Sequence, residues 1–123
     1  MGGALEQKDT QVVAVCDVNA QNMAKAKEMV DQTYENTDCA TYNDFRELIA
    51  RPDLDAVIVG TPDHWHALVS IAAAKAKKAI YCEKPLTWSL GEGKAVVKAV
   101  KENKVVFQTG SMQRSWREFK LAC

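Results

Sequence analysis

The side chains best suited to chemistry stand in two short polar turns, each directly after an apolar run. Gly60-Thr-Pro-Asp-His-Trp-His66 follows one run, and Glu83-Lys-Pro85 follows the next. An apolar run that stops abruptly at a polar turn is typical of a buried parallel strand that ends at a site. Because parallel strands end at the same edge of a sheet, the sequence predicts one row of strand ends that carries the chemistry.

Lys84 is a candidate for a catalytic residue, although the pair of Glu83 and Lys84 taken alone favours an ordinary surface salt bridge. A lysine at a strand end beside a carboxylate such as Glu83 can hold its ammonium against a carbonyl or hydroxyl group. There it can stabilise negative charge that develops on oxygen and share in proton transfer. The alternative is an ordinary surface salt bridge between Glu83 and Lys84.

Asp17 ends the first apolar run of the chain. In a dinucleotide-binding fold, an acidic side chain at this point accepts hydrogen bonds from the adenosine ribose and repels a 2′-phosphate. The alternative is a surface aspartate that shapes the turn before Asn19.

The turn Gly60-Thr61-Pro62 could admit a flat ligand, because glycine lets the backbone approach closely and proline fixes the exit. A plain strand-to-helix turn is the alternative. The two histidines nearby, His64 and His66, do not predict a metal site. Helix geometry points their rings apart, and no cysteine or third histidine completes a ligand set. We expect Asp63 to cap the following helix.

Strands alternate with helical patterns along the chain. We predict strands at residues 12–16, 39–41, 56–60, 79–83 and 105–109. Helices are predicted at residues 20–33 after an Asn19 cap, after an Asn43 cap, after Asp63, after a Ser89–Glu92 capping box, and from residue 116. This alternation, with continuous apolar strands, predicts an α/β fold with a doubly wound parallel sheet, Rossmann-like, over residues 1–123.

Composition narrows the function classes. Sixteen basic and sixteen acidic residues balance, so no overall field attracts nucleic acid or an anionic membrane. The apolar runs are far shorter than the ~20 residues of a membrane span. The four cysteines are too widely spaced for a metal or redox pair, which favours reduced thiols and a cytoplasmic protein. A small-molecule partner is therefore expected.

Three motifs together resemble the Gfo/Idh/MocA oxidoreductases, the family of glucose-fructose oxidoreductase and inositol dehydrogenase. They are Gly60-Thr-Pro-Asp-His-Trp-His66, Tyr81-Cys-Glu-Lys-Pro85 and Gln108-Thr-Gly-Ser-Met-Gln-Arg-Ser115. The similarity runs from about residue 11 to the end of the chain. It implies the nucleotide-binding half of an NAD(P)-dependent enzyme, with a sugar-like or polyol substrate and a homo-oligomeric parent.

The resemblance also assigns roles to single residues. It places the catalytic lysine at Lys84, beside the substrate, and it implies that the Lys84–Pro85 peptide bond is cis. The cofactor would contact Asp17, Asn19, Gly60, Thr61, Pro62, His66, Glu83, Lys84 and Gln113. Arg114 would bind substrate, unless it only anchors its own loop to the sheet. Asp17 favours NAD and leaves NADP open.

The chain also departs from the family. It reads Ala76-Lys77-Lys78 where the family has glycine, and a left-handed residue at Lys77 would cost about 1 kcal/mol. Compared with the family, we expect the first strand, the Gly-x-Gly-x-x-Gly turn and the substrate domain to be missing from this sequence. A non-catalytic nucleotide-binding module and an inactive fragment are therefore the alternatives to an enzyme. We expect the flanking strands, residues 12–16 and 56–60, to leave an open slot or to pair with each other.

Overall fold

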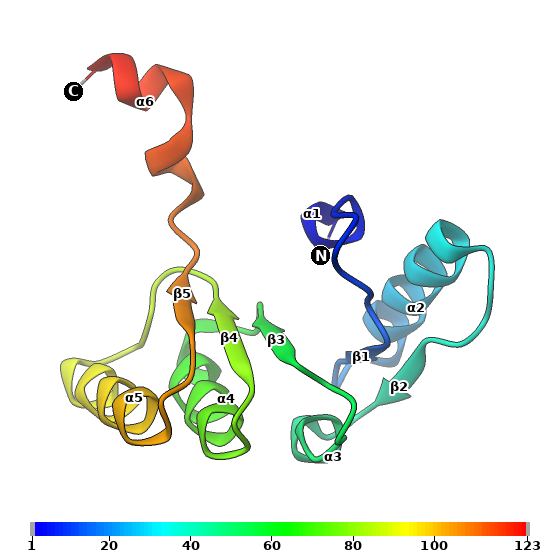
Figure 1. Ribbon diagram of the computed structural model, residues 1–123, viewed down its shortest axis with the longest axis horizontal. Coiled ribbons are helices and arrows are strands. Elements are labelled where there is room, and N and C mark those ends of the chain that lie inside the picture. The colour runs from blue at the N-terminus through cyan, green and yellow to red at the C-terminus, as the bar shows by residue number, and fades with distance from the viewer. Residues whose placement is uncertain (1, 123) are drawn as a thin grey trace. The chain divides into compact units, whose positions relative to one another are not determined.

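The computed structural model describes residues 2–122 and divides into two compact units after Leu54. Figure 1 shows the order of the elements in each unit. The alternation of strands and helices and the parallel pairing confirm the predicted α/β class. The strands form a two-stranded sheet, β1-β2, and a three-stranded sheet, β3-β4-β5.

The first unit is built on two short parallel strands, β1 (Ala14–Cys16) and β2 (Ala40–Tyr42). Both α2 (Ala20–Tyr34) and α3 (Phe45–Ile49) pack on this sheet, and the single turn α1 (Gly2–Leu5) precedes it. The core consists of Val15, Val30 and Cys39, with half-buried apolar side chains around them. Alternating strands and helices thus bury one small apolar centre.

Local signals predicted the start of α2 but not that of α3. The Asn19 side chain accepts hydrogen bonds from the amides of Gln21 and Asn22, which confirms the predicted cap. The predicted cap of α3, Asn43, is wrong, because the carboxylate of Asp44 accepts from the amide of Arg46. Asp44 also holds the Arg46 guanidinium, which lowers the pKa of its carboxyl group.

Strand β1 begins two residues later than predicted. The Val12 amide donates to the hydroxyl of Tyr34 on α2 at 3.0 Å instead of joining the strand ladder. The Val13 carbonyl already accepts from the Ala40 amide, one step before the regular pairing of Ala14 with Ala40. A side chain 22 residues away therefore sets the start of the strand.

The second unit contains the parallel strands β3 (Ala56–Val59), β4 (Ala79–Cys82) and β5 (Phe107–Thr109). Helix α4 (Asp63–Lys75) packs on β3 and β4, and α5 (Leu90–Asn103) packs on α4 (Figure 1). The chain continues through the 3₁₀ turn η1 (Met112–Ser115) into α6 (Arg117–Ala122).

The three-stranded sheet buries one face. Val57, Val59, Ile80 and Cys82 are all buried, whereas the alternate residue Ile58 is 53% exposed and Tyr81 is half-buried. The uninterrupted apolar runs led us to expect strands buried on both faces. In this unit the helices cover only one face of the sheet, and the opposite face, which carries Ile58 and Tyr81, is less buried.

The helix ends in this unit agree with the sequence in two of three cases. The capping box of Ser89 and Glu92 is present, and Lys77 has a φ of 63°, so this position does need a left-handed residue. Asp63 is not a cap, since it is the first helical residue and Pro62 occupies the cap position without a side-chain bond. Among residues 2–122, no helix has the length and apolar content that crossing a membrane requires.

Candidate functional site

The ends of β3, β4 and β5 place Gly60, Glu83 and Gly110 side by side in one row. The strands are in register at Val59, Cys82 and Thr109, so the next residue of each follows in line. The Glu83 amide donates to the Val59 carbonyl at 2.9 Å, and the Gly110 amide donates to the Cys82 carbonyl at 2.7 Å. The predicted row of strand ends is therefore present in this unit.

The Glu83 carboxylate lies directly over Gly110. A Cβ atom added at Gly110 would be 2.7 Å from Oε2 of Glu83 and 3.0 Å from the hydroxyl of Tyr81. A Cβ added at Gly60, on the other side of Glu83, would meet nothing within 4 Å. The half-buried carboxylate thus lies against the β5 side of the row, and the β3 side is open.

Sequence reasoning missed both Gly110 and Tyr81. The signal for Tyr81 was the two-residue period of a strand, which puts residues 81 and 83 on the same face of β4. Gly110 stood inside the third motif, but only the strand register shows that it lies next to Glu83.

Lys84 follows Glu83 at the surface, and its peptide bond to Pro85 is cis, as expected. The ion pairs formed by residues 2–122 do not include one between Glu83 and Lys84. The structure therefore does not support the alternative of a surface salt bridge. The exposed ammonium stands at the end of the middle strand of this sheet.

His66 is buried, whereas Lys84 is exposed. His66 has 1% of its surface exposed, and its two ring nitrogens face the backbone carbonyl oxygens of Pro85 and Thr61. His64, two residues earlier on α4, is exposed. The two rings therefore lie in different environments and do not face one metal position.

The thiol next to Glu83 has no activated character. Burial raises the pKa of Cys82 above its ordinary value, and the neighbouring Ser70 hydroxyl only partly opposes this shift. Burial also raises the pKa of Cys16, reinforced by the charge of Asp17. Both thiols stay protonated near neutral pH and offer no thiolate nucleophile.

Gln113 and Arg114 lie in η1, three and four residues beyond Gly110, with exposed side chains. The Arg114 amide donates to the Ser111 carbonyl, which closes this turn. Within the described chain, no side-chain hydrogen bond or ion pair joins either residue to Glu83 or Lys84. The structure thus places them after the last strand of the row without bringing them into it.

Asp17 and Asn19 belong to the first unit, directly after β1. One carboxylate oxygen of Asp17 accepts from the Asn19 amide at 2.8 Å, and Asn19 uses its own side-chain oxygen to cap α2. The second carboxylate oxygen of Asp17 has no partner among the described residues. Asp17 is half-buried, so its position is fixed while one acceptor remains available.

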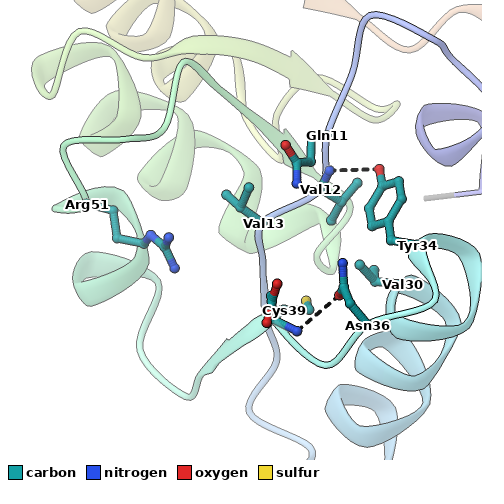
Figure 2. Close-up of a pocket in the computed structure, with 9 residues that line it drawn as sticks. Gln11, Val12, Val13, Val30, Tyr34, Asn36, Cys39 and Arg51 are labelled. Atoms are coloured by element: carbon teal, nitrogen blue, oxygen red, sulfur yellow. Dashed lines mark hydrogen bonds between the residues drawn. The ribbon is translucent and has the colours of Figure 1, made fainter.

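A cavity of about 210 Å³ lies at the opposite ends of the strands of the first unit (Figure 2). Val12 and Val13 precede β1 and Cys39 precedes β2, so this cavity is at the amino ends, away from Asp17. The bond from the Val12 amide to Tyr34 crosses one wall. Parallel sheets carry their ligand sites at the carboxyl ends of their strands, so the residues at those ends are better candidates for a ligand site than this cavity.

Comparisons with known proteins agree with this geometry. Residues 3–111 match the model of a family described as "Oxidoreductase family, NAD-binding Rossmann fold". Myo-inositol 2-dehydrogenase of Thermotoga maritima is 34% identical over 112 residues, which cover 91% of this chain and 32% of the relative. The chain thus spans about one third of the length of such relatives.

Solved structures show the same similarity in three dimensions. A probable dehydrogenase from Thermotoga maritima superposes with a TM-score of 0.79 at 33% identity, over 91% of this chain and 32% of that one. Levoglucosan dehydrogenase in complex with NADH and levoglucosan superposes with a TM-score of 0.70 at 30% identity, over 85% and 27%. The match over residues 3–111 shows that the chain belongs to the Gfo/Idh/MocA oxidoreductase family, with its NAD-binding Rossmann fold.

Proposed function

We propose that this chain is the NAD-binding part of a dehydrogenase that moves hydride between nicotinamide and a sugar-like or polyol substrate. The observation that carries the proposal is the row at the strand ends, where Glu83 lies between two glycines and Lys84 follows it. Family membership supplies the cofactor class. NAD in preference to NADP, the substrate class and the residue roles below belong to the proposal.

Each unit by itself carries residues of the kind that a dinucleotide binds. Asp17 offers an unused carboxylate oxygen at the end of β1, as hydrogen bonding to ribose hydroxyls requires. Gly60 leaves open space beside the backbone, where Thr61 and Pro62 continue the turn. Glu83 would accept from the nicotinamide ribose, and Gln113 would close the site from η1. Bound NAD would supply the nicotinamide carbon that exchanges hydride.

Lys84 and Arg114 are the proposed substrate contacts. An ammonium held against a reacting oxygen stabilises the charge that develops there and transfers a proton to or from it. The Arg114 guanidinium offers several donors in a plane, which suits a carboxylate and also binds hydroxyls. The printed names of the similar proteins, inositol and levoglucosan dehydrogenases, favour a polyhydroxylated substrate. A cytoplasmic location stays a prediction of the composition, and a homo-oligomeric parent enzyme stays a prediction of the family resemblance.

A chimaera tests the function directly. In it, the matched 112 residues of the Thermotoga myo-inositol 2-dehydrogenase are replaced by their counterparts from this chain, so that the relative supplies the remaining two thirds. We expect inositol-dependent reduction of NAD, followed by the absorbance of NADH. A chimaera that folds and binds NAD but reduces none would instead support the non-catalytic binding module.

A further inference from the structure

His66 joins the two turns that follow β3 and β4. Its Nδ1 atom lies 2.6 Å from the carbonyl oxygen of Pro85, and its Nε2 atom lies 2.8 Å from the carbonyl oxygen of Thr61. The distance to Thr61 is within the usual range of N–H···O hydrogen bonds, and the distance to Pro85 is slightly shorter than that range. One buried side chain thus connects the turn that presents Lys84 with the turn that begins at Gly60.

The chemistry of the two partners restricts the state of the ring. Backbone carbonyl oxygens only accept hydrogen bonds, and a neutral imidazole has a single N–H group to donate. A neutral ring would therefore satisfy one carbonyl and turn a lone pair toward the other at the same short distance. Only the doubly protonated imidazolium donates to both Pro85 and Thr61.

The surroundings of the ring act in both directions. Burial disfavours the charged ring, as does its position in the first turns of α4, where the helix dipole is positive. Nearby elements carry carboxylates at Asp63 and Glu83, which favour the charge, and the cation Lys84, which opposes it. The other titratable groups on α4 and on the elements packed against it are His64 and Lys75 on α4, Tyr81 and the protonated Cys82 thiol on β4, and Glu92, Lys94, Lys98, Lys101 and Glu102 on α5.

We propose that His66 is a positioning residue that holds the Lys84–Pro85 turn against the Thr61 turn, and that it holds both turns only when both ring nitrogens carry a proton. When the ring loses one proton, one of the two turns is released. The connection to the chemistry of Lys84 rests on the proposed function, whereas the two-point contact and its dependence on protonation do not.

NMR spectra of the histidine rings in the 123-residue chain test the two-point contact of His66 and need no enzymatic activity. Proton–nitrogen correlation spectra distinguish imidazolium from the neutral tautomers, and His64→Gln identifies the signals of His66 because it leaves one histidine. As the pH falls, the backbone amide signals of Thr61, Lys84 and Leu86 should shift with the same midpoint as the signals of the His66 ring. Turn signals that ignore the His66 titration, or that follow His64 in the unmodified chain, would overturn the proposal.

Variants in the chimaera supply the second readout. His66→Leu removes both donors and His66→Gln keeps one, while His64→Gln is the matched control on the exposed neighbour. We expect kcat to fall at least about tenfold in His66→Leu, and His66→Gln to recover part of it and to flatten the pH profile of kcat. If His66→Leu unfolds, the spectra of the unmodified chain still decide. Equal kcat values and equal pH profiles for His66→Gln and the control would contradict the positioning role. If the spectra confirm the two-point contact of His66 but the parent chimaera is inactive, only the proposed function is contradicted.

Discussion

Gly110 gives the Glu83 carboxylate its position, because the space that a side chain would fill at Gly110 is occupied by Oε2 of Glu83 and the Tyr81 hydroxyl. Both atoms are at the ends of flexible or rotatable side chains. A methyl group at Gly110 would therefore move them at little cost to folding, and the effect should appear in binding.

We expect Gly110→Ala to change the free energy of unfolding by less than about 1 kcal/mol and to weaken NAD binding by the chimaera several-fold. Glu83→Ala should weaken NAD binding to a similar extent. The double variant should bind NAD no more weakly than either single variant, because each of the two substitutions removes the same contact of the Glu83 carboxylate. Titration of each variant with NAD measures this. Additive losses in the double variant would show that Gly110 acts independently of Glu83.

Lys84→Ala in the chimaera should lower turnover by roughly 10²–10⁴-fold and leave NAD affinity nearly intact, since the ammonium acts on the reacting oxygen. Lys94→Ala, on the exposed side of α5, is the control for loss of one positive charge. Steady-state kinetics with NAD and inositol provide both numbers. Unchanged turnover in Lys84→Ala would remove this lysine from the mechanism.

Asp17 offers a test of cofactor choice. Asp17→Ala should weaken the binding of NAD and reduce the preference for NAD over NADP, because it removes the acceptor for the ribose hydroxyls and the repulsion of a 2′-phosphate. Asp17→Asn keeps an oxygen for the Asn19 amide but loses the charge, so it should mainly affect discrimination. The ratio of kcat/KM for the two cofactors is the measurement, and a constant ratio across these variants counts against the assignment.

At the scale of elements, three helices are followed by a left-handed residue that is not glycine. Glu35 follows α2, Lys77 lies just after α4, and Lys104 follows α5, with φ values of 53°, 63° and 55°. A side chain in this region costs about 1 kcal/mol relative to glycine. Lys77 recovers part of this cost, because its ammonium donates to the backbone and side-chain oxygens of Asn103 at the end of α5.

Lys104→Gly should therefore raise the free energy of unfolding by about 1 kcal/mol, and Lys77→Gly should raise it by less. Denaturant unfolding of the two variants and the parent chain compares them directly. A larger gain for Lys77→Gly would mean that its bonds to Asn103 contribute nothing to stability.

Most features set by neighbouring residues were predictable, although the caps expected at Asn43 and Asp63 were wrong, and features set across the fold were not predictable. The Asn19 cap, the capping box and the left-handed Lys77 each depend on a few adjacent residues, and all three are confirmed. The start of β1 depends on Tyr34, and the two bonds of His66 depend on carbonyl groups 5 and 19 residues away. No local pattern encodes such pairings, so the site was predicted as a set of strand ends but not as a network of contacts.

At the scale of the whole molecule, β1 and β3 each pair with one strand, β2 and β4 respectively, among the strands of residues 2–122. The sequence contains no Gly-x-Gly-x-x-Gly turn, the motif whose amides receive the pyrophosphate in such folds. Strand edges without partners also favour association between chains.

We expect the 123-residue chain by itself to bind NAD more weakly than the micromolar range and to self-associate. Calorimetric titration with NAD and light scattering on the same sample measure the two properties, with the chimaera as the positive control. Micromolar binding by a monomer would contradict this expectation and would show that the residues present suffice for the cofactor.

The register of β3, β4 and β5 also limits how this chain can change through insertions and deletions. Successive residues of a strand point to opposite faces, so adding or losing one residue within β5 would exchange the faces of Phe107, Gln108 and Thr109. Gly110 would leave its place beside Glu83, and a residue with a side chain would arrive there. Length changes in this domain should therefore accumulate in the loops before the strands, while the three strands themselves tolerate substitution more readily than any shift in length.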